Sequence, residues 1–303
     1  MLDFIGIGAR RAGEDWLFQQ LRRHPEIHFP HGMEMGFWSQ HYPRSLEQSD
    51  YSRNLDWYRS IFSHWEEDTP STVKQEERPI NPVQPAHKRT WFDKVMAALD
   101  SLDTRSRKAR LTDFSELAPP PPEGNAEQSA KLGDFSPTYC WFDNPATIAT
   151  IHDFAPQARI LYIIRDPHSR AWAAAEKLRE VAGLSPEETS DAWYIDHFRS
   201  SQSQKHGDYA CAINQWRTHF ADSLLVLQYE HIATDPHALL RAACAHIGVE
   251  DSTYFDAEPA PALIQSLPPE TPVRESLLPV LHDLYAAKTE ALYQSTGIDC
   301  RAH

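Results

Sequence analysis

The sequence has 303 residues, and its 29 Lys and Arg against 43 Asp and Glu give a formal net charge of −14 at pH 7. An acidic chain lacks the broad basic face that non-specific binding to DNA, RNA or anionic lipid requires. Hydrophobic residues make up 41% of the chain, which excludes a protein that is disordered throughout. We therefore expect a folded protein with one large α/β domain or two small ones, and no nucleic-acid or membrane partner.

The cysteines and the apolar runs indicate a soluble, cytoplasmic protein. The apolar stretch at the N-terminus is too short for a secretion signal, and the longest other runs, 160–164 and 224–227, are far below the roughly 20 residues of a membrane helix. The cysteines lie far apart without a Cys-x-x-Cys pair, which favours reduced thiols over a zinc site or disulfides. They are Cys140, Cys211, Cys244 and Cys300.

The first elements have the order of a phosphate-binding unit. The apolar run Leu2–Gly8 predicts a buried parallel strand, and Gly13–His24 has the spacing of a helix that Pro25 ends. Between them, Gly8–Gly13 keeps the Gly-x4-Gly frame in which backbone N–H groups converge on phosphate. An ordinary glycine-rich turn between strand and helix is the alternative.

The middle of the chain has a different character. Prolines and charged residues are frequent over 66–131, which predicts a long insertion with one amphipathic helix at Trp91–Ser106. This insertion is either a lid over the core or a surface loop.

After residue 131, strands and helices alternate. Strands are predicted over Arg159–Ile164 and Leu224–Tyr229. Helices are predicted over Pro145–His152, Ser169–Val181, Asp208–Phe220, Pro236–Ile247 with Gly248 as its stop, and within Pro272–Thr296. This alternation predicts a three-layer α/β fold with a mostly parallel central sheet.

Four segments carry a family resemblance. They are IGARRAGEDWLFQQLRRHPEI, GDFSPTYCWF at Gly133–Phe142, ARILYIIRDPHSRAWAAAEKL at Ala158–Leu178 and HFADSLLVLQYEHIATDPHALLRAACAHIGV at His219–Val249. In this order they resemble the motifs of sulfotransferases that use 3′-phosphoadenosine 5′-phosphosulfate (PAPS). The resemblance implies a bacterial sulfotransferase with a P-loop NTPase-like fold, a single domain over residues 1–303, and no metal.

The resemblance also implies a donor site. The first loop would hold the 5′-phosphosulfate, and the segment after the strand at Arg159–Ile164 would hold the 3′-phosphate. The matching positions are Arg10, Arg11, Ala12, Gly13, Glu14, Asp15, Trp16, Arg165 and Ala173.

Several of these positions depart from the family pattern. Arg11 replaces a lysine and can still neutralise phosphate. Glu14 and Asp15 replace two threonines and oppose an anionic donor unless they are protonated, turned away, or serve only as helix-capping acids. Ala173 replaces a serine and has no hydroxyl to donate.

Two nearby segments offer no replacement for the missing groups. Ser169 comes four residues too early to substitute directly for the serine. The Arg/Lys-Gly loop that usually closes over the nucleotide is missing between Ala262 and Leu277, where Arg274 is the only cation.

The acceptor side resembles the glycosaminoglycan N-sulfotransferase branch. Met33–Trp38 followed by Leu55–Tyr58 matches that branch's acidic and aromatic run, in which a glutamate is the proposed general base. The resemblance therefore implies that Glu34 is a catalytic base and that Arg11 assists as the second catalytic residue. An ordinary surface glutamate is the alternative for Glu34.

A metal site is a competing interpretation of the same region. His24, His28, His31 and Glu34 fall within eleven positions and include residue types that bind zinc or iron. Because Pro25 and Pro30 interrupt any helix that would align them, we expect packing or solvated histidines and no metal.

Three functions stay open on the sequence. The first is transfer of a sulfuryl group from PAPS to a hydroxyl or amine of a small molecule, which the net charge of −14 predicts to be neutral or cationic. The second is a binding protein that has lost PAPS, and the third is an enzyme with another donor or reaction.

Overall fold

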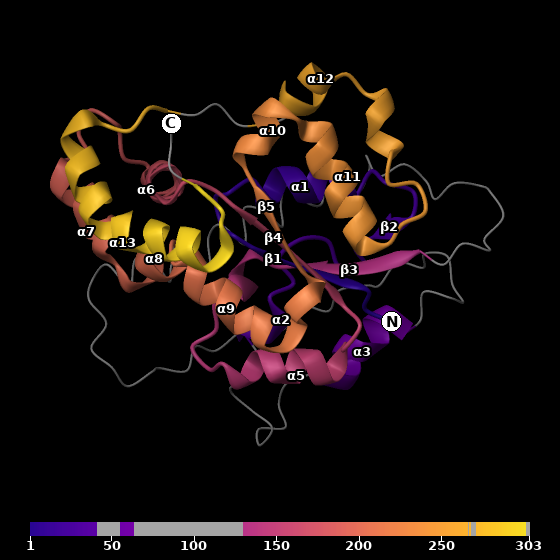
Figure 1. Cartoon of the computed structure of the whole chain (residues 1–303). Helices are drawn as coiled ribbons and strands as arrows, with labels where there is room; N and C mark the ends of the chain where they lie inside the picture. Colours follow the sequence, from indigo (N-terminus) through magenta and orange to yellow (C-terminus); the bar gives the residue numbers. More distant parts are fainter. Residues whose placement is uncertain (41–54, 64–129, 266, 268–270, 301–303) are drawn as a thin grey trace.

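The structure is a computed structural model that describes residues 1–40, 55–63, 130–265, 267 and 271–300 (Figure 1). The predicted insertion at 66–131 lies outside the described residues except for its last two positions, and the predicted helix Trp91–Ser106 lies wholly outside them. The lid and the surface loop therefore both stay predictions, as does the single domain. In the described part of the chain, no helix is both long and apolar enough to cross a membrane.

Within the described residues, a parallel sheet of five strands forms the centre of the fold, in the order β2-β3-β1-β4-β5. The strands are β1 (Phe4–Gly8), β2 (Ile27–His28), β3 (Lys131–Phe135), β4 (Arg159–Ile164) and β5 (Leu224–Gln228). The structure confirms the three predicted strands, which correspond to β1, β4 and β5. Strands β2 and β3 are additions to the prediction. Strand β2 has only two residues, and β3 (KLGDF) contains charged residues and a glycine, so neither forms an apolar run.

Helices cover both faces of this sheet (Figure 1). The α-helices are α1 (Glu14–Leu21), α2 (Phe37–Gln40), α3 (Leu55–Ser63), α5 (Ala146–Phe154), α6 (Pro167–Val181), α7 (Asp191–Arg199), α8 (Ser201–His206), α9 (Tyr209–Phe220), α10 (Glu230–Thr234), α11 (Pro236–Ile247), α12 (Ala260–Gln265) and α13 (Leu278–Thr296). Single turns of 3-10 helix occur at η2 (Pro137–Cys140), η3 (Ala221–Ser223), η4 (Tyr254–Ala257) and η5 (Glu275–Leu277). The predicted helices that fall within the described residues are confirmed within a few residues, while α2, α3, α7, α8, α10 and α12 were not predicted.

Alternation along the strands builds the two faces. Ile5 and Ile160 pack into a core with α2, α3, α5 and α9, whereas Phe4 and Leu161 pack into a second core with α1 and α11. Successive side chains of a strand point to opposite faces, so strands buried on both faces need apolar residues at nearly every position. The three-layer α/β prediction is therefore confirmed.

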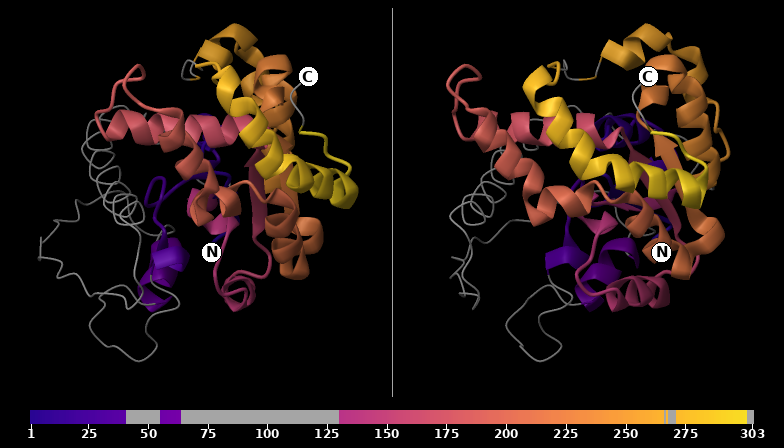
Figure 2. Two further views of the ribbon diagram at one scale, coloured as in Figure 1. Left: turned by 90° about the vertical axis from the view of Figure 1, so that its left-hand side faces the viewer. Right: turned by 60° about the vertical axis from the view of Figure 1, so that its left-hand side comes forward.

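A third apolar core joins the C-terminal helix to the rest. Helix α13 lies across α6 and packs on α7 and α9 (Figure 2). Trp172 of α6, Tyr194 of α7 and Tyr285 of α13 are among its buried side chains. This core fixes α6, whose N-terminus leads directly into the candidate site.

Candidate functional site

The candidate site lies at the carboxyl ends of the parallel strands. Strand β1 has β3 on one side and β4 on the other, so the connections that follow β1 and β3 leave toward opposite edges of the sheet. Open α/β sheets bind ligands at such a switch point, outside the carboxyl ends of the strands. The residues predicted to contact the donor and acceptor come from the segments that follow β1, β2 and β4.

The loop after β1 is built as an anion-binding nest. Its backbone has positive φ angles at Arg11 (66°) and Gly13 (89°), and alternation of this kind turns successive N–H groups inward. The N–H of Arg11 donates to one carboxylate oxygen of Glu14 at 2.8 Å, and the N–H of Ala12 donates to the other at 2.9 Å. The loop therefore binds an anionic group of its own chain.

The Glu14 side chain turns into the loop. From the sequence, its carboxylate opposes an anionic donor unless it is protonated or turned away, and helix capping was the alternative. In the structure the side chain does not turn away, is only 2% exposed, and accepts from residues that precede helix α1. Burial, followed by the neighbouring charge of Asp15, raises the pKa of Glu14 to about 7, although the charge of Arg11 and backbone hydrogen bonds from Arg11 and Glu14 act in the opposite direction. Charged and neutral forms of Glu14 are therefore both populated near neutral pH.

Charged side chains link this loop to the predicted base. The guanidinium of Arg11 lies 3.8 Å from the carboxylate of Asp15, whose side chain is 49% exposed. The guanidinium of Arg10 lies 3.9 Å from the carboxylate of Glu34, and both side chains are 17% exposed. The structure thus brings Glu34 beside the predicted donor loop.

Two other predicted donor residues pack into the protein. The Ala12 side chain is buried, and the Trp16 indole lies in the core, where its N–H donates to the carbonyl of Leu263 at 2.9 Å. Through their side chains these residues fix the loop and the start of α1 against the core.

Arg165 and Tyr229 join the ends of β4 and β5. The guanidinium of Arg165, in a residue that is 8% exposed, lies 4.4 Å from the centre of the Tyr229 ring. The N–H of Tyr229 donates to the carbonyl of Ile164 at 2.8 Å, and the N–H of Asp166 donates to the Glu230 carboxylate at 3.0 Å. These contacts fix the turn that carries Arg165.

Tyr229 also contacts the loop after β1. A Cβ atom placed on Gly13 would lie 2.7 Å from Cδ2 of Tyr229, so only glycine permits this close approach. Tyr229 therefore contacts both predicted phosphate-binding segments. No role was predicted for Tyr229 from the sequence, although its place in the Tyr-Glu turn after β5 could be read there.

The start of α6 has no hydroxyl in the predicted position. Ala173 is partly exposed on α6, two turns beyond the start of the helix. The Ser169 hydroxyl donates to the Asp166 carboxylate at 2.7 Å, and the Ser169 N–H donates to the same oxygen at 2.8 Å. This hydroxyl takes part in the cap of helix α6, so its proton is directed at Asp166.

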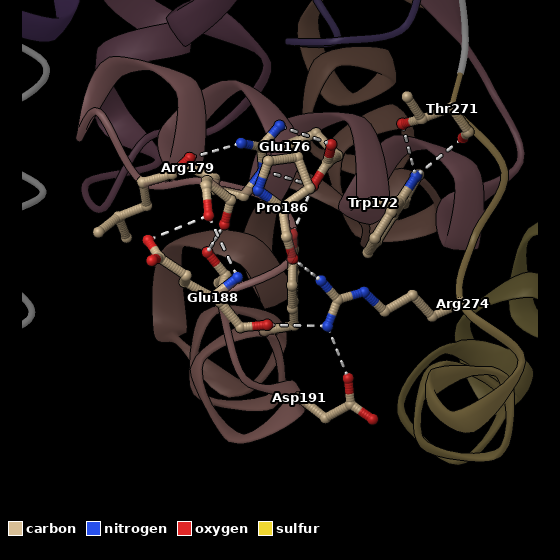
Figure 3. A network of polar contacts seen from close by, with 12 residues as sticks. Trp172, Glu176, Arg179, Pro186, Glu188, Asp191, Thr271 and Arg274 are labelled. Atoms are coloured by element: carbon tan, nitrogen blue, oxygen red, sulfur yellow. Dashed lines mark hydrogen bonds and ion pairs between the residues drawn. The ribbon is translucent and has the colours of Figure 1, made fainter.

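Arg274 lies in a structural network (Figure 3). Its guanidinium donates to the Asp191 carboxylate and to the Thr189 carbonyl, both at 2.9 Å, and lies 4.6 Å from the centre of the Tyr194 ring. The Trp172 indole N–H donates to the carbonyl of Thr271 at 2.9 Å, in the same segment. These contacts hold the chain before α13 against α6 and α7.

A buried carboxylate organises the acceptor side. Asp134, at the end of β3, is fully buried and accepts hydrogen bonds from three hydroxyls. The donors are Tyr58 at 2.8 Å, Tyr139 at 2.9 Å and Ser136 at 2.9 Å. Burial raises the pKa of Asp134, and the three hydroxyl donors partly oppose this. The network joins α3 to the segment after β3.

The same network positions the segment that contains Glu34. The Ser136 hydroxyl accepts from the N–H of Gly36 at 3.0 Å, and the N–H of Glu34 donates to the Phe135 carbonyl at 2.8 Å. The Phe37 ring stacks on the Tyr58 ring, with centroids 4.4 Å apart. The two halves of the predicted acceptor run, 33–38 and 55–58, therefore pack together.

A histidine and a cysteine near the loop were not predicted. Nδ1 of His206 lies 3.5 Å from Sγ of Cys140. Burial, followed by the charges of Arg170 and Arg10, lowers the pKa of His206 to about 3, while burial raises the pKa of Cys140 to about 12. Both groups are therefore neutral at physiological pH. No spacing rule connects positions this far apart in the sequence.

The histidines of the competing metal interpretation lie in other environments. Nε2 of His24 lies 2.8 Å from the carbonyl of Asp251, and its Nδ1 accepts from the N–H of Glu26 at 3.2 Å. The His31 ring packs against Trp57, with centroids 5.4 Å apart. Among the residues that the structure describes, no group of three or more His, Cys, Asp or Glu is placed to hold a metal ion.

Comparison with known proteins shows the family. The model of the sulfotransferase family matches residues 3–253, so the chain belongs to the sulfotransferase family, as predicted. The match does not favour the glycosaminoglycan N-sulfotransferase branch in particular. No curated protein matched the chain.

Solved structures resemble the chain in fold. A sulfotransferase from Alicyclobacillus acidocaldarius is 19% identical, with a TM-score of 0.54 and coverage of 99% of this chain and 97% of that one. The sulfotransferase domain of the Synechococcus PCC 7002 olefin synthase is 16% identical, with a TM-score of 0.40 and coverage of 93% of each chain. The sulfotransferase domain from the curacin biosynthetic pathway is 13% identical, with a TM-score of 0.40, and coverage is 94% of this chain and 98% of that one. The first of these supports the predicted sulfotransferase fold.

Proposed function

We propose that the protein transfers a sulfuryl group from PAPS to a hydroxyl or amine of a small-molecule acceptor. The observation that carries this proposal is the nest after β1, in which the N–H groups of Arg11 and Ala12 bind a carboxylate. A loop that binds one anionic group at this place in a sulfotransferase-family chain is suited to another. Arg165 adds a buried cation at the neighbouring strand end.

The arginines on the donor side have the charge that a phosphorylated nucleotide requires. PAPS supplies the sulfuryl group, and the protein's contribution is to position it and to stabilise charge on its oxygens. In this proposal Arg11 and the loop N–H groups bind the 5′ end, and Arg165 binds the 3′-phosphate. The side chains of Ala173 and Asp15 have no hydrogen-bond donor to offer to a phosphate. The affinity for PAPS is therefore expected to depend strongly on the arginines.

The acceptor-side residues fit proton removal by Glu34. The backbone N–H of Glu34 is held by its hydrogen bond to the carbonyl of Phe135, and the hydrogen bonds of the Asp134 network fix the segment that follows Glu34. A catalytic carboxylate needs this kind of support, because a base that is displaced by about 1 Å loses much of its effect. The Arg10 guanidinium at 3.9 Å links the base to the donor loop.

The acceptor is proposed to be small and either neutral or cationic. The formal charge of −14 disfavours a polyanionic acceptor such as a heparin-like chain. The four free cysteines suit the reducing environment of the cytoplasm, where we propose that the protein acts.

Sulfate transfer from radiolabelled PAPS to a panel of neutral and cationic alcohols and amines tests the proposal. The wild type is expected to label at least one class of acceptor, and Glu34→Gln is expected to abolish labelling while retaining nucleotide binding. If Glu34→Gln turns over at the wild-type rate, Glu34 is not the base. If the wild type binds nucleotide but labels no acceptor and releases no sulfate, the proposed transfer is wrong.

The position of Glu14 also favours a second candidate. Its carboxylate already satisfies the two N–H groups that would bind the donor. If the Glu14 carboxylate never leaves these N–H groups, the protein does not bind PAPS. It would then be a binding protein with a sulfotransferase fold, or an enzyme that uses another donor. Nucleotide binding separates the two candidates, because only the first requires it.

A further inference from the structure

The Glu14 carboxylate occupies the nest as a bound anion would. Its two oxygens accept from the consecutive N–H groups of Arg11 and Ala12, so neither N–H can bind a ligand in the same way at the same time. The side chain is 2% exposed, so these contacts lie out of solvent. The position is one at which the family pattern has a hydroxyl-bearing threonine.

The charge around Glu14 is close to balanced. Arg11 favours its ionised form, and Asp15 disfavours it. The Cys140 thiol of η2 also interacts with Glu14 and is neutral, because burial raises its pKa to about 12. A phosphosulfate that entered this nest would add negative charge beside a carboxylate already at the edge of protonation.

We infer that Glu14 closes the phosphate loop in the nucleotide-free protein and admits the donor only in its protonated form, so that donor binding is coupled to uptake of a proton by Glu14. This inference rests on the proposed function. The proton comes from solvent and adds to a carboxylate oxygen, and no other bond forms or breaks. The neutral carboxyl accepts from the N–H groups of Arg11 and Ala12 more weakly than the carboxylate does, so the donor's oxygens can displace it, and its own O–H becomes a hydrogen-bond donor. It then offers the hydrogen bond that the family's threonine hydroxyl offers.

The coupling has a definite pH dependence. In the free protein the pKa of Glu14 is about 7, so below pH 7 most molecules already carry the proton and binding takes up little. Above pH 7 each binding event must bring a proton, and affinity is expected to fall about tenfold per pH unit. At pH 8 the expected uptake is about 0.9 proton per nucleotide. The phosphate groups lose their second proton near pH 6, so they contribute little between pH 7 and 9.

Titration calorimetry with adenosine 3′,5′-bisphosphate, in buffers of different ionisation enthalpy, measures this uptake directly. At pH 8 the wild type is expected to take up about 0.9 proton. Glu14→Gln is expected to take up less than about 0.2 and to bind with the same affinity from pH 7 to 9. Glu14→Thr, which restores the family's residue, provides a second variant should Gln impair folding. Asp15→Asn is the matched control, because it removes a neighbouring carboxylate and leaves the N–H contacts in place, and it should retain the uptake.

The outcomes separate this inference from the proposed function. Equal proton uptake by the wild type, Glu14→Gln and Glu14→Thr would overturn the inference while leaving donor binding intact. Binding by the variants at pH 8 with none by the wild type would support it, since the carboxylate alone would then block the nest. No binding by any of these proteins at about 1 mM nucleotide, at pH 6 or at pH 8, would overturn the proposed function and this inference with it.

Discussion

The guanidinium of Arg165 lies over the ring of Tyr229, with 4.4 Å between its central carbon and the ring centroid. The same ring contacts Gly13 so closely that a Cβ there would lie 2.7 Å from Cδ2 of Tyr229. One aromatic side chain directly after β5 therefore contacts the segments after β1 and β4. A guanidinium over an aromatic face is held in position without losing its charge.

Tyr229→Leu should weaken binding of adenosine 3′,5′-bisphosphate. Leucine removes the cation–π contact, which contributes roughly 1 kcal/mol, so we expect an affinity loss of about fivefold. Tyr229→Phe keeps the ring and should bind within about twofold of the wild type. Calorimetry of the three proteins measures this, and equal affinities for Leu and Phe would show that the ring does not position Arg165.

Gly13→Ala should destabilise the fold as well as the loop. Gly13 has a φ of 89°, and the added methyl group would meet Tyr229 at 2.7 Å, so both strain and overlap apply. We expect a loss of roughly 2 to 4 kcal/mol in the free energy of unfolding by urea. Gly183→Ala is the matched control, since its φ is 69° and no atom lies within 4 Å of the new methyl, and it should lose only about 1 kcal/mol. Equal losses would show that Tyr229 yields to the methyl group.

Glu14→Gln should change how stability depends on pH. The folded-state pKa of about 7 is above the ordinary value of 4.5, so the stabilisation by Glu14 is complete below about pH 4.5 and is lost as the pH rises through 7. Relative to Glu14→Gln, the wild type should lose on the order of 3 kcal/mol of unfolding free energy between pH 4.5 and 8. Urea unfolding of both proteins across this range measures the difference. A constant difference would mean that Glu14 titrates normally in the fold.

Ala173→Ser should strengthen nucleotide binding. The substitution adds a hydroxyl at the position where the family pattern has one, and a hydrogen bond to a charged phosphate contributes roughly 1.5 to 3 kcal/mol. We expect a gain in affinity of at least about tenfold by calorimetry. Ala174→Ser is the matched control, because it adds the same hydroxyl to the next residue of α6, about 100° around the helix. The same gain in both variants would show that position 173 has no special relation to the nucleotide.

The fold was largely predictable because the apolar composition of the central strands indicates that they are buried on both faces. β1, β4 and β5 are apolar runs, and the helices between them have clear boundaries such as the Asp-Pro starts at Asp166 and Asp235. β3 was missed because KLGDF owes its burial to its place between β1 and β2. Tertiary position, which no local pattern contains, decides such strands.

The sequence led to a set of candidate positions for the site, but not to the contacts that these residues make. The motifs directed attention to Arg11, Glu14, Glu34 and Arg165, but not to the direction in which Glu14 turns. That direction depends on positive φ angles at Arg11 and Gly13, and arginine rarely adopts such an angle. The contacts of Tyr229 require three loops to meet, which only the folded chain shows.

We propose that the loop after β1 and Arg165 bind the nucleotide of PAPS at the carboxyl ends of β1 and β4. Calorimetry with adenosine 3′,5′-bisphosphate at pH 6.5, where Glu14 is largely protonated, tests it most directly. We predict a dissociation constant on the order of 10 μM for the wild type, and a loss of at least about 30-fold in Arg165→Ala. No binding by the wild type at about 1 mM nucleotide, or equal binding by Arg165→Ala, would contradict the claim.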